Sequence, residues 1–156
     1  MNSKNSESIC ECDGFAMYLN QQVQSHNVFD YLLERAGHAE RMIISSFAIT
    51  EAYVRRIIRN RERIDKIDLI LDFTIASRNP RITMYAAQNV DNLYLVNNHS
   101  KIIYVESRGQ SMAAVMSNNA TNNHRFESGV IISDSSKAQT FGEAFELVIQ
   151  QAVRYG

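Results

Sequence analysis

The sequence has little of what marks a secreted or membrane-spanning protein. It contains two cysteines in 156 residues, and no apolar run is long enough to cross a bilayer. The polar N-terminus also lacks the apolar segment of a signal peptide, so we expect a soluble cytoplasmic protein. A net charge of −1 provides no general attraction to nucleic acid or to an anionic membrane, so either partner would need a local basic patch.

The two cysteines, Cys10 and Cys12, are separated by a single residue in a polar segment. A zinc site would need a second pair of ligands, and a disulfide across one intervening residue would be strained. We therefore expect two free thiols. Because no other group of side chains has the spacing of metal ligands, the sequence predicts neither a metal ion nor a cofactor.

The length and composition are those of one globular domain. With 45% hydrophobic and 21% charged residues, one proline and few glycines, the chain is large enough to bury a core. Residues 1–13 are mainly Ser, Asn, Glu and Cys, with little to bury, which predicts a disordered N-terminal arm. Residues 14–156 are then expected to form a single domain.

Short apolar runs alternate with helix-like stretches along the rest of the chain. Strands followed by helices in the first half, and strands with short connections in the second, predict an α/β domain in which helices flank a layered mixed β-sheet. The expected strands cover residues 41–49, 66–75, 92–96, 101–106, 113–117 and 126–132. The expected helices cover residues 15–36 (with a break near 26–27), 50–63, 79–87 and 140–155, and residues 134–136 are expected to form a loop.

Two polar pairs stand at the ends of two of these strand-like runs. His99 and Lys101 lie two apart at the start of one run, and Ser117 and Asn119 lie two apart at the end of the next. In a strand, residues i and i+2 point to the same face, so each pair can be presented together. Side by side, the pairs would supply an imidazole, an ammonium, a hydroxyl and an amide, which are groups suited to attack and hold a phosphate.

This stretch resembles the signature of the phospholipase D superfamily. In that signature, H-x-K is followed four residues later by Asp, then by G-S-x-N and a downstream Glu. The matching positions in this sequence are His99, Lys101, Glu106, residues 116–119 (M-S-N-N) and Glu127. Glu106 stands where the signature usually has Asp, and Met116 stands where it usually has Gly.

A looser resemblance covers residues 40–132, and the chain length is similar to that of the small single-motif endonucleases of the superfamily. The resemblance implies a phospholipase D-like fold. It also implies that Glu127 is the carboxylate that accepts a hydrogen bond from the second nitrogen of His99. Glu106 has the opposite strand parity to His99, so we expect it to support the structure by anchoring the turn after the strand.

The chemistry of these residues predicts phosphodiester cleavage. An unperturbed imidazole has a pKa of about 6.5, so His99 can act as a nucleophile near neutral pH and form a phosphohistidine. Lys101, Ser117 and Asn119 would stabilise the non-bridging oxygens in place of a metal ion.

One histidine cannot perform both halves of the reaction, because the leaving oxygen needs an acid on the opposite side of phosphorus. The superfamily meets this need with two copies of the motif. A chain with one copy is therefore expected to form a homodimer with one shared active site. In it, His99 would be the nucleophile in one subunit and the general acid in the other.

An arginine-rich segment within residues 50–63 is a second candidate surface. Two interpretations are open: the solvated face of an amphipathic helix, or a cationic ridge that binds a phosphate backbone. The candidate substrate contacts are Arg55, Arg56, Arg59, His124 and Arg125.

The sequence thus favours a metal-independent phosphodiesterase, acting as a nuclease on DNA or RNA. The preference for nucleic acid rests on the resemblance and on the arginines. One alternative is a catalytically impaired domain that binds nucleic acid or dimerises, which Met116 and the acidic balance favour. Another is a phospholipid phosphodiesterase, but no membrane-seeking helix is evident, so we expect no membrane partner. A third is a structural domain with a coincidental motif.

Overall fold

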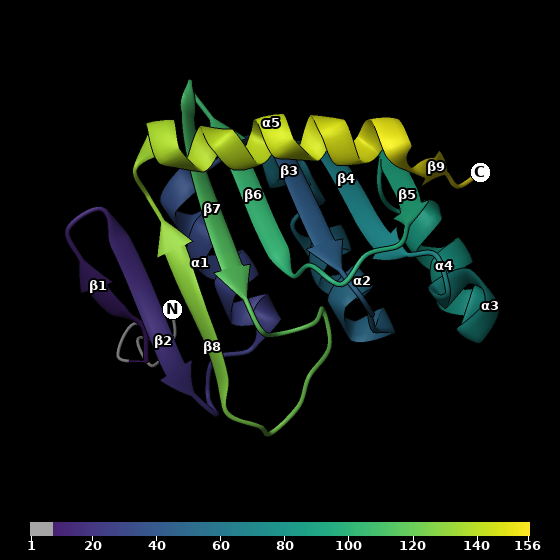
Figure 1. Ribbon diagram of the computed structural model, residues 1–156, viewed down its shortest axis with the longest axis horizontal. Helices are drawn as coiled ribbons and strands as arrows, with labels where there is room; N and C mark the ends of the chain where they lie inside the picture. The colour runs from purple at the N-terminus through teal and green to yellow at the C-terminus, as the bar shows by residue number, and fades with distance from the viewer. Residues whose placement is uncertain (1–7) are drawn as a thin grey trace.

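A nine-stranded mixed β-sheet forms the centre of the protein, and helices cover both of its faces (Figure 1). The computed structural model describes residues 8–156, and residues 1–7 of the expected N-terminal arm lie outside the described residues. The strands are β1 (Cys10–Cys12), β2 (Phe15–Asn20), β3 (Ala39–Ser46), β4 (Ile64–Asp72), β5 (Asn92–Val96), β6 (Ile102–Ser107), β7 (Gln110–Met116), β8 (Glu127–Ile132) and β9 (Val153–Arg154). The helices are α1 (Ser25–Ala36), α2 (Glu51–Arg59), the 3-10 turn η1 (Arg61–Arg63), α3 (Ile75–Arg78), α4 (Pro80–Ala87) and α5 (Ser135–Gln151).

The order of the strands across the sheet is β1-β2-β8-β7-β6-β3-β4-β5-β9. Strands β3, β4 and β5 are parallel and are connected through helices, whereas the other neighbouring pairs are antiparallel. Strands β6 and β7 form a hairpin through Arg108 and Gly109, which both have a positive φ, as a tight hairpin turn requires. The expected α/β fold with a layered mixed sheet is confirmed.

The alternation of side chains along the strands divides the interior into two apolar layers. On β3, Met42 and Ile44 point into the larger layer beneath α1, α2 and α4, while Ile43 points into the smaller layer beneath α5. Figure 1 shows α5 crossing one face of the sheet near one end of the strands, with α1 and α2 behind the sheet. The helix therefore leaves the other end of the strands on its own face uncovered.

Capping residues set the start of three helices. Thr50 accepts a hydrogen bond from the backbone N–H of Tyr53 at the start of α2, and Asn79 accepts one from Ile82 at the start of α4. Asp134 caps α5 in the same way, so α5 begins at Ser135 and the loop expected at residues 134–136 is wrong. Among the helices in the described part of the chain, none is both long and apolar enough to cross a membrane.

The helix expected over residues 15–36 is wrong in its first part, because residues 15–20 form β2. There Ala16 and Tyr18 are buried while their neighbours are exposed, and the strand pairs with β8 more than a hundred residues away in the chain. The expectation of a disordered arm is wrong for residues 9–13, because Ile9 is buried and β1 pairs with β2. The expected helix from residue 50 ends at Arg59 rather than Arg63.

Gly142 allows α5 to approach the sheet closely, and Gly142→Ala is expected to destabilise the protein. A Cβ at this position would lie 2.6 Å from the hydroxyl oxygen of Tyr104, a fully buried side chain whose hydroxyl is bonded to Glu106 and Ser111. The overpacking should cost about 1–3 kcal/mol in the free energy of unfolding, measured by urea denaturation.

The exposed residue Ala144 of the same helix provides a control, since Ala144→Gly reports helix propensity alone. If Gly142→Ala instead stabilised the protein by about 1 kcal/mol, as alanine does at an unhindered helical glycine, the close contact with Tyr104 would not be present.

Candidate active site

The ends of several strands meet at one edge of the sheet. There β3, β4, β5 and β7 end and β6 begins, at the lower edge in Figure 1. The segment that carries His99 connects β5 to β6, and residues 117–126 connect β7 to β8. The backbone N–H of Met116 donates to the carbonyl oxygen of Lys101 at 3.0 Å. The sheet therefore brings the two polar pairs of the sequence to one place.

A buried polar network fixes the segment that carries His99. The preceding residue, Asn98, is only 7% exposed. Its backbone N–H donates to Asp72 Oδ2 at 3.1 Å, and its side-chain nitrogen donates to Ser45 Oγ at 3.0 Å. Its side-chain oxygen accepts from the backbone N–H of Ser100 at 3.0 Å. Because the backbone N–H and both polar atoms of the Asn98 side chain are paired, the backbone around His99 is held in one conformation.

Asp72 is the ionised member of this network. Burial raises the pKa of its carboxyl, but hydrogen bonds from Thr74 and Asn98 and the nearby charge of Arg78 outweigh burial and leave the pKa below its ordinary value. Asp72 has the strand-end capping role that its position after an apolar run predicts, whereas Asn98 was missed as a supporting residue of the site. The feature of the sequence that could have indicated such a residue is the set of small polar residues at the ends of strands that are otherwise apolar.

His99 and Lys101 lie together at this edge. His99 is exposed, and Lys101 Nζ is 3.2 Å from its Nδ1 and donates to its carbonyl oxygen at 2.7 Å. Desolvation lowers the pKa of Lys101, and the negative charge of Glu127 partly offsets this. The imidazole also stands 5.2 Å from the ring of Phe47, which has the guanidinium of Arg78 at 4.7 Å from its centre. Neither Phe47 nor Arg78 was expected from the sequence.

Ser117 and Glu127 form the second half of the site. The Ser117 hydroxyl donates to the Glu127 carboxylate and accepts from the backbone N–H of Ser128 at 3.0 Å. Asn123 Nδ2 donates to the other carboxylate oxygen at 2.9 Å. Within residues 8–156, no hydrogen bond joins Glu127 to His99. The hydrogen bond between them that the resemblance implies is thus not formed in a single chain and stays a prediction.

Asn119 lies beside the end of β3. The Ser46 hydroxyl donates to the carbonyl oxygen of Ala48 at 2.6 Å, and the side-chain oxygen of Asn119 lies 3.5 Å from the same hydroxyl. The same Ser46 oxygen accepts from the backbone N–H of Ala120 at 2.9 Å, and the Ser46 carbonyl accepts from Asn98 at 3.2 Å. Ser46 therefore links the two chain segments that carry the motif.

The remaining motif residues lie away from this cluster. Glu106 is at the far end of β6, where it accepts a hydrogen bond from the Tyr104 hydroxyl at 2.9 Å. The Met116 side chain packs in the larger apolar layer and is 9% exposed. His124 and Arg125 are exposed in the connection from β7 to β8, so their role as substrate contacts stays a prediction.

The arginines within residues 50–63 do not form one continuous cationic ridge. Arg61 and Arg63 lie beyond α2, where Arg61 pairs with Asp91 and Arg63 donates to backbone carbonyls. Arg55 and Arg56 are held by Glu51 and Asp30. Arg59 is exposed, and it makes no ion pair or hydrogen bond with any residue that the structure describes.

Metal ligands are not grouped in the part of the chain that the structure describes, where no three His, Cys, Asp or Glu side chains come together. Cys10 and Cys12 are free and exposed on β1.

Comparison with solved structures relates this fold to known proteins, although neither a protein-family model nor a curated protein matches the sequence. Nuc from Salmonella typhimurium, described as a phospholipase D family member, has a TM-score of 0.69 and 16% identity over 90% of this chain and 98% of that chain. NucT from Helicobacter pylori has a TM-score of 0.72 and 14% identity over 90% of this chain and 98% of that chain. A phosphatidylserine synthase from Haemophilus influenzae has a TM-score of 0.63 and 12% identity over 90% of this chain and 40% of that chain. The chain therefore has the fold of the phospholipase D family.

Proposed function

We propose that this protein is a metal-independent phosphodiesterase that cleaves nucleic acid through a covalent phosphohistidine, at a site shared by two copies of the chain. The observation that carries the proposal is the contact between the exposed His99 imidazole and the Lys101 ammonium, beside Ser117 and Glu127. A nucleophile, a cation and neutral donors thus stand at one edge of the sheet, as phosphoryl transfer requires. Similarity in fold to Nuc and NucT is consistent with this proposal.

In the first step, His99 Nε2 attacks phosphorus and forms a P–N bond. The P–O bond to the leaving group breaks, and its electron pair stays on the leaving oxygen, which takes a proton from His99 of the partner subunit. Lys101 and Asn119 stabilise the negative charge on the non-bridging oxygens. In the second step, water attacks phosphorus and gives a proton back to that second imidazole, and the P–N bond breaks to release His99.

The contact with Lys101 gives His99 a defined tautomer. An ammonium has no lone pair, so His99 Nδ1 must be the acceptor in this contact, and a neutral imidazole then holds its proton on Nε2. The general acid is the imidazolium, which has a proton on both nitrogens, so it forms when Nδ1 takes up a proton and this contact with Lys101 is lost. The nucleophile needs its proton on Nδ1 and a carboxylate to accept it, which is the role proposed for Glu127.

An exposed apolar patch supports the homodimer. The patch consists of Met17 and Leu19 on β2, Val115 on β7 and Val130 on β8, with exposed fractions of 45%, 68%, 38% and 42%. Strand pairing places these residues on one face of the sheet, where α5 does not reach (Figure 1). Ser117 is two residues beyond Val115, so a two-fold axis through the patch would bring the two copies of the site together.

Turnover in the presence of a chelator tests this function. We expect the protein to hydrolyse bis(p-nitrophenyl) phosphate and labelled single- or double-stranded DNA in excess EDTA, because side chains supply every group in the scheme above. The measurement is release of p-nitrophenolate and gel analysis of the DNA. Loss of activity in EDTA would contradict the mechanism. No turnover from a folded dimer would favour the alternative, a nucleic-acid-binding or dimerisation module without turnover.

A further inference from the structure

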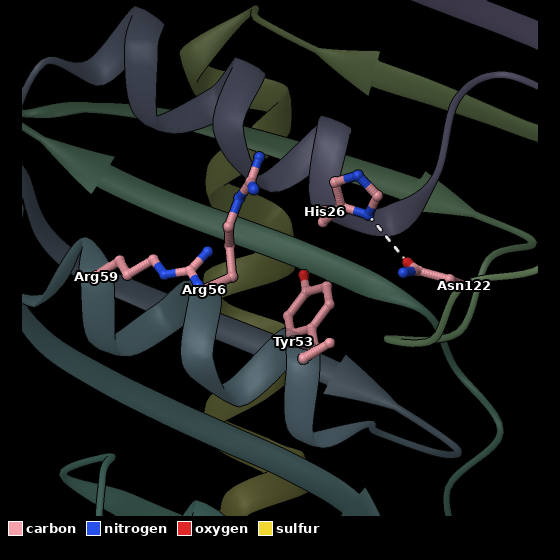
Figure 2. Close-up of a pocket in the computed structure, with 6 residues that line it drawn as sticks. His26, Tyr53, Arg56, Arg59 and Asn122 are labelled. Atoms are coloured by element: carbon pink, nitrogen blue, oxygen red, sulfur yellow. Dashed lines mark hydrogen bonds between the residues drawn. The ribbon is translucent and has the colours of Figure 1, made fainter.

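A small polar pocket lies between the start of α1, the side of α2 and the connection from β7 to β8 (Figure 2). We propose that it binds a phosphodiester group of the nucleic-acid strand next to the bond that is cleaved, so that the protein holds its substrate at two phosphates. This inference rests on the proposed function, because it names a second contact for the same substrate. The lining residues are His26, Ala52, Tyr53, Arg56, Arg59 and Asn122.

The pocket is open and has room for an anion. Its volume is about 150 Å³, well above the ~10–15 Å³ that one water molecule needs. Figure 2 shows that Arg56 and Arg59 extend from α2 on one side and that Asn122 approaches from the other. Tyr53 is fully buried at the base, where its hydroxyl accepts a hydrogen bond from Ser25 at 3.3 Å.

The donors on the two sides are chemically suited to phosphate oxygens. Arg59 is the arginine of α2 for which the described residues provide no partner, so its guanidinium is available for a bidentate contact. Arg56 is tied to Asp30 by two hydrogen bonds, which hold its side chain in place and offset its charge. The pocket therefore has one uncompensated positive charge, which suits the single negative charge of a phosphodiester.

His26 positions the neutral donor. Its Nδ1 lies 3.1 Å from Asn122 Oδ1, and because an amide oxygen can only accept, Nδ1 is the donor. This contact fixes the orientation of the Asn122 amide and leaves its nitrogen free to donate to a ligand.

The pocket is connected to the active site through a single segment of chain. Asn122 is five residues after Ser117, and the next residue, Asn123, donates its backbone N–H to Gln24 Oε1 at 3.1 Å. The Asn123 side chain donates to Glu127 at 2.9 Å. A phosphate held by Asn122 would thus act on the same segment that orients the catalytic carboxylate.

The position of the pocket favours nucleic acid as its ligand. It lies on the face of the sheet that carries α1 and α2, whereas the apolar patch that we assign to the dimer lies on the opposite face. The pocket therefore stays accessible in the dimer. Because the donors that line it are polar side chains, the pocket suits a backbone contact that does not depend on sequence.

The test compares two variants, each with one arginine replaced by glutamine, in a protein that cannot cleave DNA. In the His99→Gln background, affinity for a fluorescein-labelled 12-nucleotide single-stranded DNA is measured by anisotropy at several salt concentrations. Arg59→Gln is expected to weaken binding about 3–10-fold and to reduce the salt dependence of log Kd by about 0.7, the value for one phosphate contact on a single strand. Arg108→Gln is the matched control, because Arg108 is an exposed arginine in the turn at the opposite end of the sheet.

A second variant tests the neutral donor. Asn122→Asp keeps an oxygen that can accept from His26 but replaces the free amide nitrogen with a negative charge, so it should weaken DNA binding at least as much as Arg59→Gln. The subsite would be refuted if both pocket variants bound the DNA as tightly as the Arg108→Gln control. Loss of binding to phosphatidylglycerol vesicles in Arg59→Gln, with unchanged DNA binding, would assign the pocket to a membrane surface and would also overturn the inference.

The two proposals can fail separately. If the wild-type protein hydrolysed no phosphodiester but Arg59→Gln still weakened DNA binding, turnover would be refuted and the subsite would stand. If the wild type were active and Arg59→Gln behaved like Arg108→Gln, the subsite would be refuted and the enzyme would stand.

Discussion

Replacement of His99 by glutamine is expected to abolish phosphodiester hydrolysis, with a fall in kcat of at least about 10³-fold. Glutamine keeps a polar side chain but cannot form the phosphoryl-enzyme intermediate or donate a proton to the leaving oxygen. His99 is exposed and its backbone is held by Asn98, so the variant should keep the stability of the wild type. The measurements are steady-state hydrolysis of bis(p-nitrophenyl) phosphate and the midpoint of thermal unfolding.

His38 provides the matched control, since it is a partly exposed histidine paired with Asp65 rather than with the site. His38→Gln should retain full activity.

A mixing experiment provides a further check of the shared site, because a dimer with one His99 lacks either the nucleophile or the acid. Equal amounts of wild type and His99→Gln, unfolded and refolded together, should retain about one quarter of the activity that the same total amount of wild type shows. Retention of about one half would mean that each chain works alone and would contradict the shared site.

A charge in the apolar patch is expected to separate the subunits and thereby remove activity. Val130 lies near the centre of the patch and is 42% exposed, so Val130→Glu places its carboxylate in water in the monomer. In the dimer, the same carboxylate would be buried without a partner, which typically costs several kcal/mol for each copy. We expect a folded monomer by size-exclusion chromatography with light scattering, and a loss of turnover comparable to that of His99→Gln.

Met84→Glu is the control for this substitution. Met84 is 52% exposed on α4, on the opposite side of the sheet from the patch, so the same added charge should leave the dimer intact. The outcome that would sink the proposal is a fully active Val130→Glu monomer, because activity would then not depend on the patch.

The sequence predicted much of the fold because local patterns and tertiary structure agree over most of the chain. The expected strand at residues 92–96 has the bounds of β5, and the helix expected from Asn79 and Pro80 matches α4 and its cap. The motif also predicted correctly that His99 and Lys101 would lie together, because two residues so close in the chain meet under many local conformations.

The errors occur where a pattern is compatible with two structures. The apolar residues between 15 and 20 fit one face of a helix as well as an alternating strand, and only the partner strand β8 selects the strand. The arginines after Thr50 likewise suggest a ridge, whereas Asp30 and Asp91, which neutralise two of them, come from distant parts of the chain.

By itself the sequence determined the class of fold, most of the elements and the set of groups that the proposed chemistry needs, since these follow from local periodicity and residue type. The tertiary structure alone decided how those groups are supported. Ser45 and Asp72 hold Asn98, the residue before His99, through hydrogen bonds. Ser117 and Asn123 both donate hydrogen bonds to the Glu127 carboxylate. An apolar patch lies exposed beside the site. The contacts of Asn98 with Ser45 and Asp72, and the patch formed by β2, β7 and β8, join residues far apart in the chain, so they depend on strand order and register, which no local pattern contains.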